Sequence, residues 1–319
     1  MRDGNKLNNP PKDVGEPEKI RIPRLRLKDP VLIEGTGPFG SLGGKAGIWL
    51  RPANKPGWFW KKKDGTRVPI DMSMIREGTF DVHRRHYLYF QHGAEKLLVV
   101  EHLLALRFLG IDAVEIEVAQ GAGEWVPYGG NANLYWEKIE RHVKYDGVLK
   151  PSKLRTSNSY TATDKEGRIR TVHLDTTNPE KPEFIVTVKI DYPRFKGNLP
   201  EGTHEITHRF PLGQPSDMAD VVASRPLLQP SWLEPVLKMA YSAGIWPHFD
   251  QVLKRSEFDP NDPTPYLREI ALHRLLDLLG SLAVTMDAGE YHTGSVSSER
   301  GGHSVDVELL KKVAADVAA

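Results

Sequence analysis

Residues 97–110 read LLVVEHLLALRFLG, and the organisation of the chain can be worked out from this stretch. Apolar residues recur at helical spacing, and Gly110 follows where a glycine commonly ends a helix. We therefore predict a helix from Leu97 to Leu109. The pair Glu101-His102 interrupts the apolar pattern. An unpaired buried polar group costs roughly 2–7 kcal/mol, so these two side chains need partners, and a metal ion would supply one.

The patterns on either side of this helix predict an α+β fold. Apolar runs or alternation predict strands at 31–33, 48–50, 114–118, 169–174, 183–192 and 203–210. Helical spacing predicts further helices at 133–143, 232–243, 265–282 and 305–317. Each half of the chain runs from strands to helices, which is an order typical of α+β proteins.

The segment Tyr145-Asp146-Gly147 reads as a turn and as a domain boundary. We predict a first α+β domain over residues 19–147 and a second over residues 148–319. Residues 1–18 are polar and rich in proline, so they cannot bury enough apolar surface to fold. We predict that they form a disordered tail.

The composition excludes several classes of protein. The 319 residues carry a net charge of +1, which is not the basic footprint of a nucleic-acid-binding protein. The sequence contains neither a signal-peptide pattern nor an apolar run of 18 residues, so we expect a cytoplasmic protein without a membrane segment. Cysteine is absent, so any zinc site must use histidine and carboxylate ligands, the usual set for catalytic zinc.

A second polar cluster lies on the predicted helix at 265–282. His273 and Asp277 are four residues apart, so their side chains share one helix face and can bind one zinc ion with a third ligand. Such a pair is more often a hydrogen-bonded pair at the surface. In the same way, Glu101 can simply favour a helix start, and His303, after two glycines, is either a general acid or an exposed loop histidine.

Two further patterns imitate known sites. Residues 204–208 fit the zinc-protease motif HExxH, but they alternate polar and apolar residues and predict a strand. On a strand the two histidines lie about 13 Å apart, too far for one ion. Residues 35–40 fit GxGxxG, but a strand pattern follows where a dinucleotide site needs a helix.

Taken in order, the segments resemble the zinc-dependent UDP-3-O-acyl-N-acetylglucosamine deacetylases of lipid A synthesis. VEHLL at 100–104 resembles their VEHLLAAL helix, and IEV at 116–118 follows as it does in that family. HRLLDLLG at 273–280 resembles their HKxLDxIGDL helix, GH at 302–303 their SGHxxNxxLL segment, and LRPA at 50–53 matches directly. The resemblance covers roughly residues 28–315.

The resemblance implies a fold of two similar domains, each a β-sheet layered against helices, with the active site at their interface. It implies one Zn²⁺ held by His102, His273 and Asp277. It also implies Glu101 as general base and His303 as general acid. Arg274 stands where the family has a lysine and would stabilise the oxyanion.

The sequence departs from the family around this machinery. Ser281 replaces an acid that supports the general-acid histidine, and the glycine loop at 35–45 is longer and lacks its histidine. Gly129-Gly130-Asn131-Ala132 replaces DGSA. Lys189 stands where the family has a threonine near the substrate amide, which makes it a candidate for substrate binding. The segment 244–257, the counterpart of an insert that forms the acyl-chain passage, is more polar than such a passage favours.

We therefore predict a zinc-dependent deacetylase that removes the N-acetyl group of a UDP-3-O-acyl-N-acetylglucosamine-type substrate. Its expected partner is a small N-acyl amino sugar linked to a nucleotide, and we expect a monomer. One alternative is a divergent relative that deacetylates another N-acetylated sugar or amide. Another is a non-catalytic protein that binds zinc or a sugar nucleotide.

Overall fold

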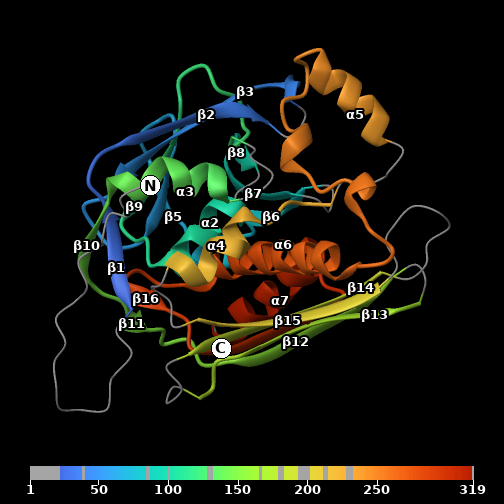
Figure 1. Ribbon diagram of the computed structural model, residues 1–319. Coiled ribbons are helices and arrows are strands. Elements are labelled where there is room, and N and C mark those ends of the chain that lie inside the picture. Colours follow the sequence, from blue (N-terminus) through green and yellow to red (C-terminus); the bar gives the residue numbers. More distant parts are fainter. Residues whose placement is uncertain are drawn as a thin grey trace, which may run out of the picture.

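The computed structural model describes residues 22–37, 40–83, 87–98, 101–127, 132–164, 167–178, 183–192, 202–210, 215–227 and 233–317. The tail predicted over 1–18 lies outside these residues. The chain is α+β, as predicted, and its two longest helices lie between layers of strands (Figure 1). Of the helices described, none is long and apolar enough to cross a membrane.

The N-terminal part of the chain builds a five-stranded sheet in the order β2-β3-β9-β4-β5. Its strands are β2 (Val31–Gly37), β3 (Gly40–Pro52), β9 (Val114–Val118), β4 (Trp58–Lys61) and β5 (Arg67–Pro69). A smaller sheet contains β6 (Phe80–His83), β7 (Tyr87–His92) and β8 (Glu95–Leu98). β1 (Pro23–Leu27) pairs with β10 (Val143–Val148), and the helices here are α1 (Met72–Arg76), α2 (Glu101–Leu104) and α3 (Asn133–Ile139).

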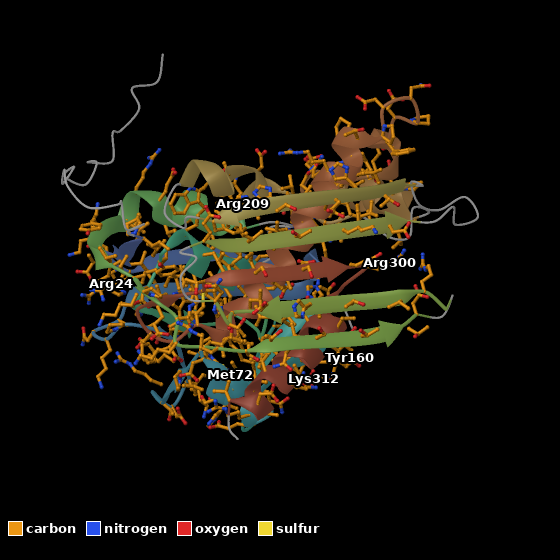
Figure 2. The ribbon with its side chains drawn as sticks, turned by 90° about the horizontal axis from the view of Figure 1, so that it is seen from below. Arg24, Met72, Tyr160, Arg209, Arg300 and Lys312 are labelled. Carbon is orange, nitrogen blue, oxygen red and sulfur yellow. The ribbon has the colours of Figure 1, made fainter. Side chains whose placement is uncertain are left out.

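The C-terminal part builds a second five-stranded sheet in the order β12-β13-β17-β14-β15. Its strands are β12 (Ser157–Thr163), β13 (Ile169–Asp175), β17 (Gly294–Glu299), β14 (Phe184–Tyr192) and β15 (Gly202–Phe210). α6 (Thr264–Leu282) and α7 (His303–Asp316) cover one face of this sheet (Figure 1), and Figure 2 views its other face. α4 (Pro215–Ala223), α5 (Leu233–Ser242) and the short parallel pair β11 (Lys150–Pro151) and β16 (Glu290–Tyr291) complete the part.

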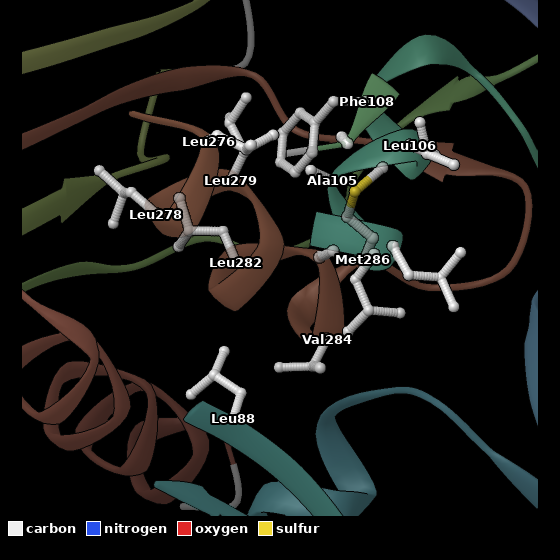
Figure 3. Close-up of a cluster of buried hydrophobic side chains, with 14 of the residues drawn as sticks. Leu88, Ala105, Leu106, Phe108, Leu276, Leu278, Leu279, Leu282, Val284 and Met286 are labelled. Carbon is white, nitrogen blue, oxygen red and sulfur yellow. The ribbon is translucent and has the colours of Figure 1, made fainter. Parts of the chain in front are cut away.

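One hydrophobic core runs through both parts of the molecule. Leu276 and Leu279 of α6 lie beside Phe108 of the N-terminal part (Figure 3). The Phe108 ring also stacks on Phe184 of β14, with centroids 5.9 Å apart. No strand within the described ranges pairs across residue 149, so each sheet belongs to one part. Because the core is continuous, the division into two domains at 147/148 stays a prediction.

The predicted helix over 97–109 is wrong in its first turn. Leu97 and Leu98 belong to β8 and pair with Phe90 and Tyr89 of β7. The helical residues begin at Glu101 with α2 and continue as a 3₁₀ helix, η1 (Ala105–Leu109). A short apolar run fits a buried strand as well as a helix, which explains the error. Gly110 ends the element at φ 82°, as predicted.

The predicted turn at 145–147 is also wrong, because these residues continue strand β10. Gly147 has φ 106°, and the register of β10 against β1 shifts between Pro23 and Leu25. A glycine at positive φ marks a strand irregularity as readily as a turn. The sequence patterns also missed β12 and α4. The predicted strand over 114–118 and the helices α6 and α7 are confirmed to within two residues.

Candidate metal centre

The centre forms where α2 crosses α6 at a glycine. A Cβ atom on Gly280 would lie 2.1 Å from the carbonyl oxygen of Glu101, so the two backbones touch and any side chain at 280 would separate them. This close approach brings His102 of α2 against the face of α6 that carries His273 and Asp277. Two local features of the sequence produce this arrangement. His273 and Asp277 have i,i+4 spacing on α6, and a glycine follows three residues after Asp277.

Two imidazoles converge on one carboxylate oxygen. Nε2 of His102 lies 3.4 Å from Oδ1 of Asp277, and Nε2 of His273 lies 3.6 Å from the same oxygen. The two rings meet edge to face, with centroids 5.1 Å apart and an interplanar angle of 73°. The three potential ligand atoms therefore surround a common point inside the protein.

This arrangement fits a metal ion better than it fits hydrogen bonds. Nε2 of His102 and Oδ1 of Asp277 are buried and have no hydrogen-bond partner among the residues that the structure describes, although buried polar groups are normally paired. Their 3.4 Å separation matches the ~3.3–3.5 Å between tetrahedral ligands bound at about 2.0–2.2 Å. Two imidazole nitrogens and one carboxylate oxygen suit zinc.

The backbone of Ser224 orients the second histidine. Ser224 directly follows α4, and its carbonyl oxygen lies 3.0 Å from Nδ1 of His273. Nδ1–H therefore donates to this carbonyl, which leaves the Nε2 lone pair directed at Asp277. Burial lowers the pKa of His273 to about 4. The ring is therefore neutral near pH 7, the form that binds metals.

Charges within the centre shift the other two groups toward their ionised forms. Burial alone would raise the pKa of Asp277, but the neighbouring His273, His303 and His102 outweigh it and lower that pKa. Burial lowers the pKa of His102, but its contact with Asp277 and the charge of Glu101 outweigh burial and raise it. A bound cation would oppose this protonation, since a ligating imidazole must be neutral.

Glu101 and His303 flank the convergence point. Glu101 is buried, and its Oε2 accepts a long hydrogen bond of 3.4 Å from the backbone N–H of Leu88 in β7. His303 begins α7, and its Nε2 lies 3.9 Å from Oδ2 of Asp277. Glu101, Asp277 and His303 form a second group whose potential ligand atoms lie within 4.8 Å of one another. A carboxylate and an imidazole thus lie beside the candidate metal ligands.

The family model described as LpxC, UDP-3-O-acyl N-acetylglycosamine deacetylase, matches residues 24–315. The chain belongs to the LpxC family. No curated protein matches the chain. The family is one of deacetylases, which are hydrolases, and the described residues include histidine and aspartate groups of a kind that can hold a metal.

In this LpxC-family protein Arg274 has a partner that the sequence did not predict. Its guanidinium forms an ion pair with the carboxylate of Asp306 on α7, and Nη2 also lies 3.3 Å from Oγ of Ser298. All three side chains are buried. Asp306 carried no sequence signal, because it contacts Arg274 only when α6 and α7 pack together.

The structure does not bring Lys189 to the other candidate residues. On β14 the side chains of Val188 and Ile190 are buried on the face that α6 covers, so Lys189 points to the opposite face. There Nζ of Lys189 lies 3.2 Å from a carboxylate oxygen of Glu299 on the neighbouring strand. Its proposed contact with the substrate amide has no support from this position.

The two lookalike motifs lie where the sequence predicted. Residues 204–208 are part of strand β15, in register with β14, so they do not form a helical zinc motif. Residues 35–37 belong to β2, and β3 begins at Gly40, so a strand follows the glycine motif.

Of the positions that depart from the family pattern, Ser281 donates a hydrogen bond of 3.0 Å to the carbonyl oxygen of Asp277. Residues 129–131 lie outside the described residues.

Segment 244–257 forms a small apolar cluster of its own. Trp246, Phe249 and Val252 pack together apart from the main core. His248 connects this cluster to the N-terminal part, since its Nε2 lies 2.7 Å from Oγ1 of Thr36 on β2. The segment is therefore less polar inside than its sequence suggested.

One cavity lies away from the centre. This cavity of about 790 Å³ is lined by residues of α1, the 153–157 segment and the end of α7. Its lining includes both cationic side chains, such as Arg76 and Arg155, and carboxylates, such as Asp71 and Asp316. None of the candidate site residues Glu101, His102, His273, Asp277 and His303 lines this cavity. The cavity is therefore separate from the candidate metal centre.

Proposed function

We propose that this chain is a zinc-dependent amide hydrolase that removes the N-acetyl group of a UDP-3-O-acyl-N-acetylglucosamine-type substrate. The observation that carries the proposal is the pair of buried atoms without hydrogen-bond partners, Nε2 of His102 and Oδ1 of Asp277, which converge with His273. Membership in the LpxC family supports the substrate class.

His102, His273 and Asp277 would hold the zinc ion. When bound, zinc supplies Lewis acidity and lowers the pKa of water at the site towards about 7. The chain's own contribution is orientation: Ser224 fixes the ring of His273, and the Gly280 contact fixes α2 against α6.

Glu101 and His303 would move the protons. The buried carboxylate of Glu101 accepts a proton from the attacking water as the water oxygen bonds to the acetyl carbon. His303 donates a proton to the amide nitrogen as the C–N bond breaks, so that acetate and a free amine leave. Both side chains lie beside Asp277, and this geometry supports binding of the scissile amide next to them.

Two measurements test this proposal together. Protein purified without added metal should contain one zinc per chain, and it should release acetate from UDP-3-O-acyl-N-acetylglucosamine. The same sugar nucleotide without its acyl chain should react more slowly. Faster reaction of the shortened substrate would favour the divergent deacetylase, and bound zinc with no acetate release would favour the binding protein. Absence of metal would overturn the proposal.

A matched variant separates the two histidine motifs of the chain. His204→Ala changes the lookalike motif on β15 and should leave the zinc content at one per chain. His102→Ala removes a proposed ligand and should lower the zinc content sharply. The reverse result would mean that the metal binds at the strand motif.

A further inference from the structure

The loop before His303 is held by an arginine of the sheet. Arg170 of β13 donates from Nε to the carbonyl oxygen of Arg300, at 2.7 Å, and from Nη2 to that of Gly301, at 3.1 Å. Arg300 itself has a left-handed backbone, with φ 49°, and Figure 2 labels it at the end of its strand. The backbone that leads into α7 is therefore fixed at two consecutive carbonyls.

A buried ion pair lies directly beneath this loop. Arg274 and Asp306 are only 8% and 1% exposed and form an ion pair. Arg274 is the residue after the candidate ligand His273, and Asp306 lies one turn after His303. The ion pair therefore connects the helix of the candidate ligands to the helix that begins with the candidate general acid.

The loop approaches this pair so closely that a side chain at either glycine would displace its neighbours. A Cβ atom on Gly301 would lie 2.1 Å from Oγ of Ser298 and 2.7 Å from Nη2 of Arg274. A Cβ atom on Gly302 would lie 2.6 Å from Nη2 of Arg170. The two glycines allow the backbone to rest on the arginines.

We propose that Arg274 and Asp306 are positioning residues for His303. Their ion pair fixes the first turn of α7 against α6, and this places Nε2 of His303 beside Asp277, at 3.9 Å. The inference rests on the proposed function, in which His303 donates a proton. In this inference the guanidinium of Arg274 pairs with the carboxylate of Asp306 and does not stabilise the oxyanion of the reaction. A displacement of about 1 Å at a reacting group can lower a rate about 100-fold.

The first test is Asp306→Asn, which keeps the shape of the side chain and removes its charge. We expect kcat to fall about 10- to 100-fold, with the KM and zinc content unchanged. A direct oxyanion role for Arg274 gives the opposite expectation, because loss of Asp306 would free the guanidinium and keep or raise kcat. An unchanged or raised kcat would therefore overturn the proposal.

Two further variants keep the test decisive if Asp306→Asn folds poorly. The double variant Arg274→Met, Asp306→Leu removes both charges, and Arg274→Lys keeps an ion pair. We expect the double variant to fold and to lose about tenfold or more in kcat, and Arg274→Lys to retain most of it. Full activity of the double variant would contradict the proposal. Glu117→Gln, which removes the 2.6 Å ion pair with Arg51 in the other sheet, is the control.

A readout besides activity separates this proposal from the proposed function. In crystal structures of the zinc-loaded proteins, Asp306→Asn should move the His303 ring away from Asp277, and Glu117→Gln should not. An unmoved ring would overturn the positioning role. If the wild-type protein released no acetate, the proposed function would fail, while the position of the ring would still decide this inference.

Discussion

At the scale of single residues, the environment of Glu101 bears most directly on the proposed reaction. Its carboxylate is buried, contacts the centre and has a weak bond of 3.4 Å to the amide of Leu88. An acidic group held in this way can accept a proton without first breaking a strong bond. This geometry suits the general-base role that we propose for Glu101, and the side chain contributes little to holding β7.

Glu101→Gln should separate base catalysis from metal binding. The glutamine oxygen can still accept from the amide of Leu88, so the fold and the zinc content should be retained, but it cannot accept the proton. We expect turnover to fall at least about 100-fold. Acetate release and metal analysis on the same preparation measure both effects. Unchanged turnover would remove Glu101 as the base, and Glu117→Gln is a carboxylate control outside the centre.

The buried His292 should make the protein less stable in acid. Its ring packs against both Phe108 and Phe184, and its Nε2 lies 2.7 Å from Oγ1 of Thr285. Burial lowers its pKa to about 4. The unfolded chain, with a histidine pKa near 6.5, then binds more protons between pH 6.5 and 4. The contribution of His292 to the free energy of unfolding therefore has its full value above pH 6.5. It falls by about 3 kcal/mol as the pH is lowered towards 4.

Urea unfolding at pH 7 and pH 4 checks this expectation. His292→Gln has no imidazole to protonate, so its free energy of unfolding should depend less on pH by about 3 kcal/mol. His142→Gln changes a histidine whose side chain is 43% exposed and is the control. An equal pH dependence in wild type and His292→Gln would contradict the assignment.

The sequence could predict which side chains converge at the candidate centre but not the groups that orient them. His273 and Asp277 are recognisable because they lie four apart on one helix, and Glu101-His102 because it interrupts an apolar run. The carbonyl of Ser224 has no sequence signature, since every residue has one. The partnership of Arg274 with Asp306 depends on how α6 packs against α7, which no local pattern encodes.

At the scale of elements, the contact between α2 and α6 decides whether the ligands meet. Gly280→Ala adds a methyl group 2.1 Å from the carbonyl of Glu101, so the helices must separate and carry His102 away from Asp277. We expect zinc affinity to fall about tenfold or more and stability to fall by about 1–3 kcal/mol. Competition with a chromogenic chelator measures the affinity.

Ala271→Gly is the matched control on the same helix. It should destabilise α6 by about 1 kcal/mol through helix propensity. It should leave zinc affinity unchanged, because residues two apart, such as Ala271 and His273, lie on different faces of a helix. If both variants lost zinc equally, general weakening of α6 and not the α2 contact would be responsible.

Element boundaries could be predicted where the hydrophobic pattern was long. α6 and α7 extend over several turns, so their periodicity is unambiguous, and both predicted ranges end within two residues of the observed ones. The run at 97–100 is too short to separate strand from helix. β12 was missed because its exposed positions are serine and threonine and few of its residues are apolar.

At the scale of the whole molecule, Arg107 joins the two parts of the chain. It is buried in η1 and donates to the carbonyl oxygens of Ile70, at 3.0 Å, Ala283, at 2.7 Å, and Met286, at 2.8 Å. Ala283 and Met286 follow α6, so one side chain connects elements that come from opposite halves of the sequence.

Arg107→Met should destabilise the molecule by at least about 3 kcal/mol, because each buried carbonyl that loses its donor costs about 1–3 kcal/mol. Urea unfolding measures the loss. Arg24→Met removes a partly exposed ion pair with Asp146 and should cost no more than about 1 kcal/mol. A similar small effect at Arg107 would mean that other contacts hold the two parts together.

The α+β class could be predicted from the order of strand and helix patterns, but the relation between the halves could not. Two separate domains and one shared core are both compatible with two successive strand-to-helix series. The stacking of Phe108 on Phe184 makes the core continuous between the two parts. The sequence pattern around each phenylalanine indicates that the side chain is buried, but not which side chain it contacts.

The division of the ligands between α2 and α6 also sets an order of events during synthesis. His102 leaves the ribosome about half a chain before His273 and Asp277 do. At translation speeds of 5–20 residues per second this interval lasts roughly 10–30 s. The nascent N-terminal part therefore presents a single candidate ligand for most of its synthesis. Metal capture should be among the last steps of maturation, and a chain stalled before α6 should emerge without metal.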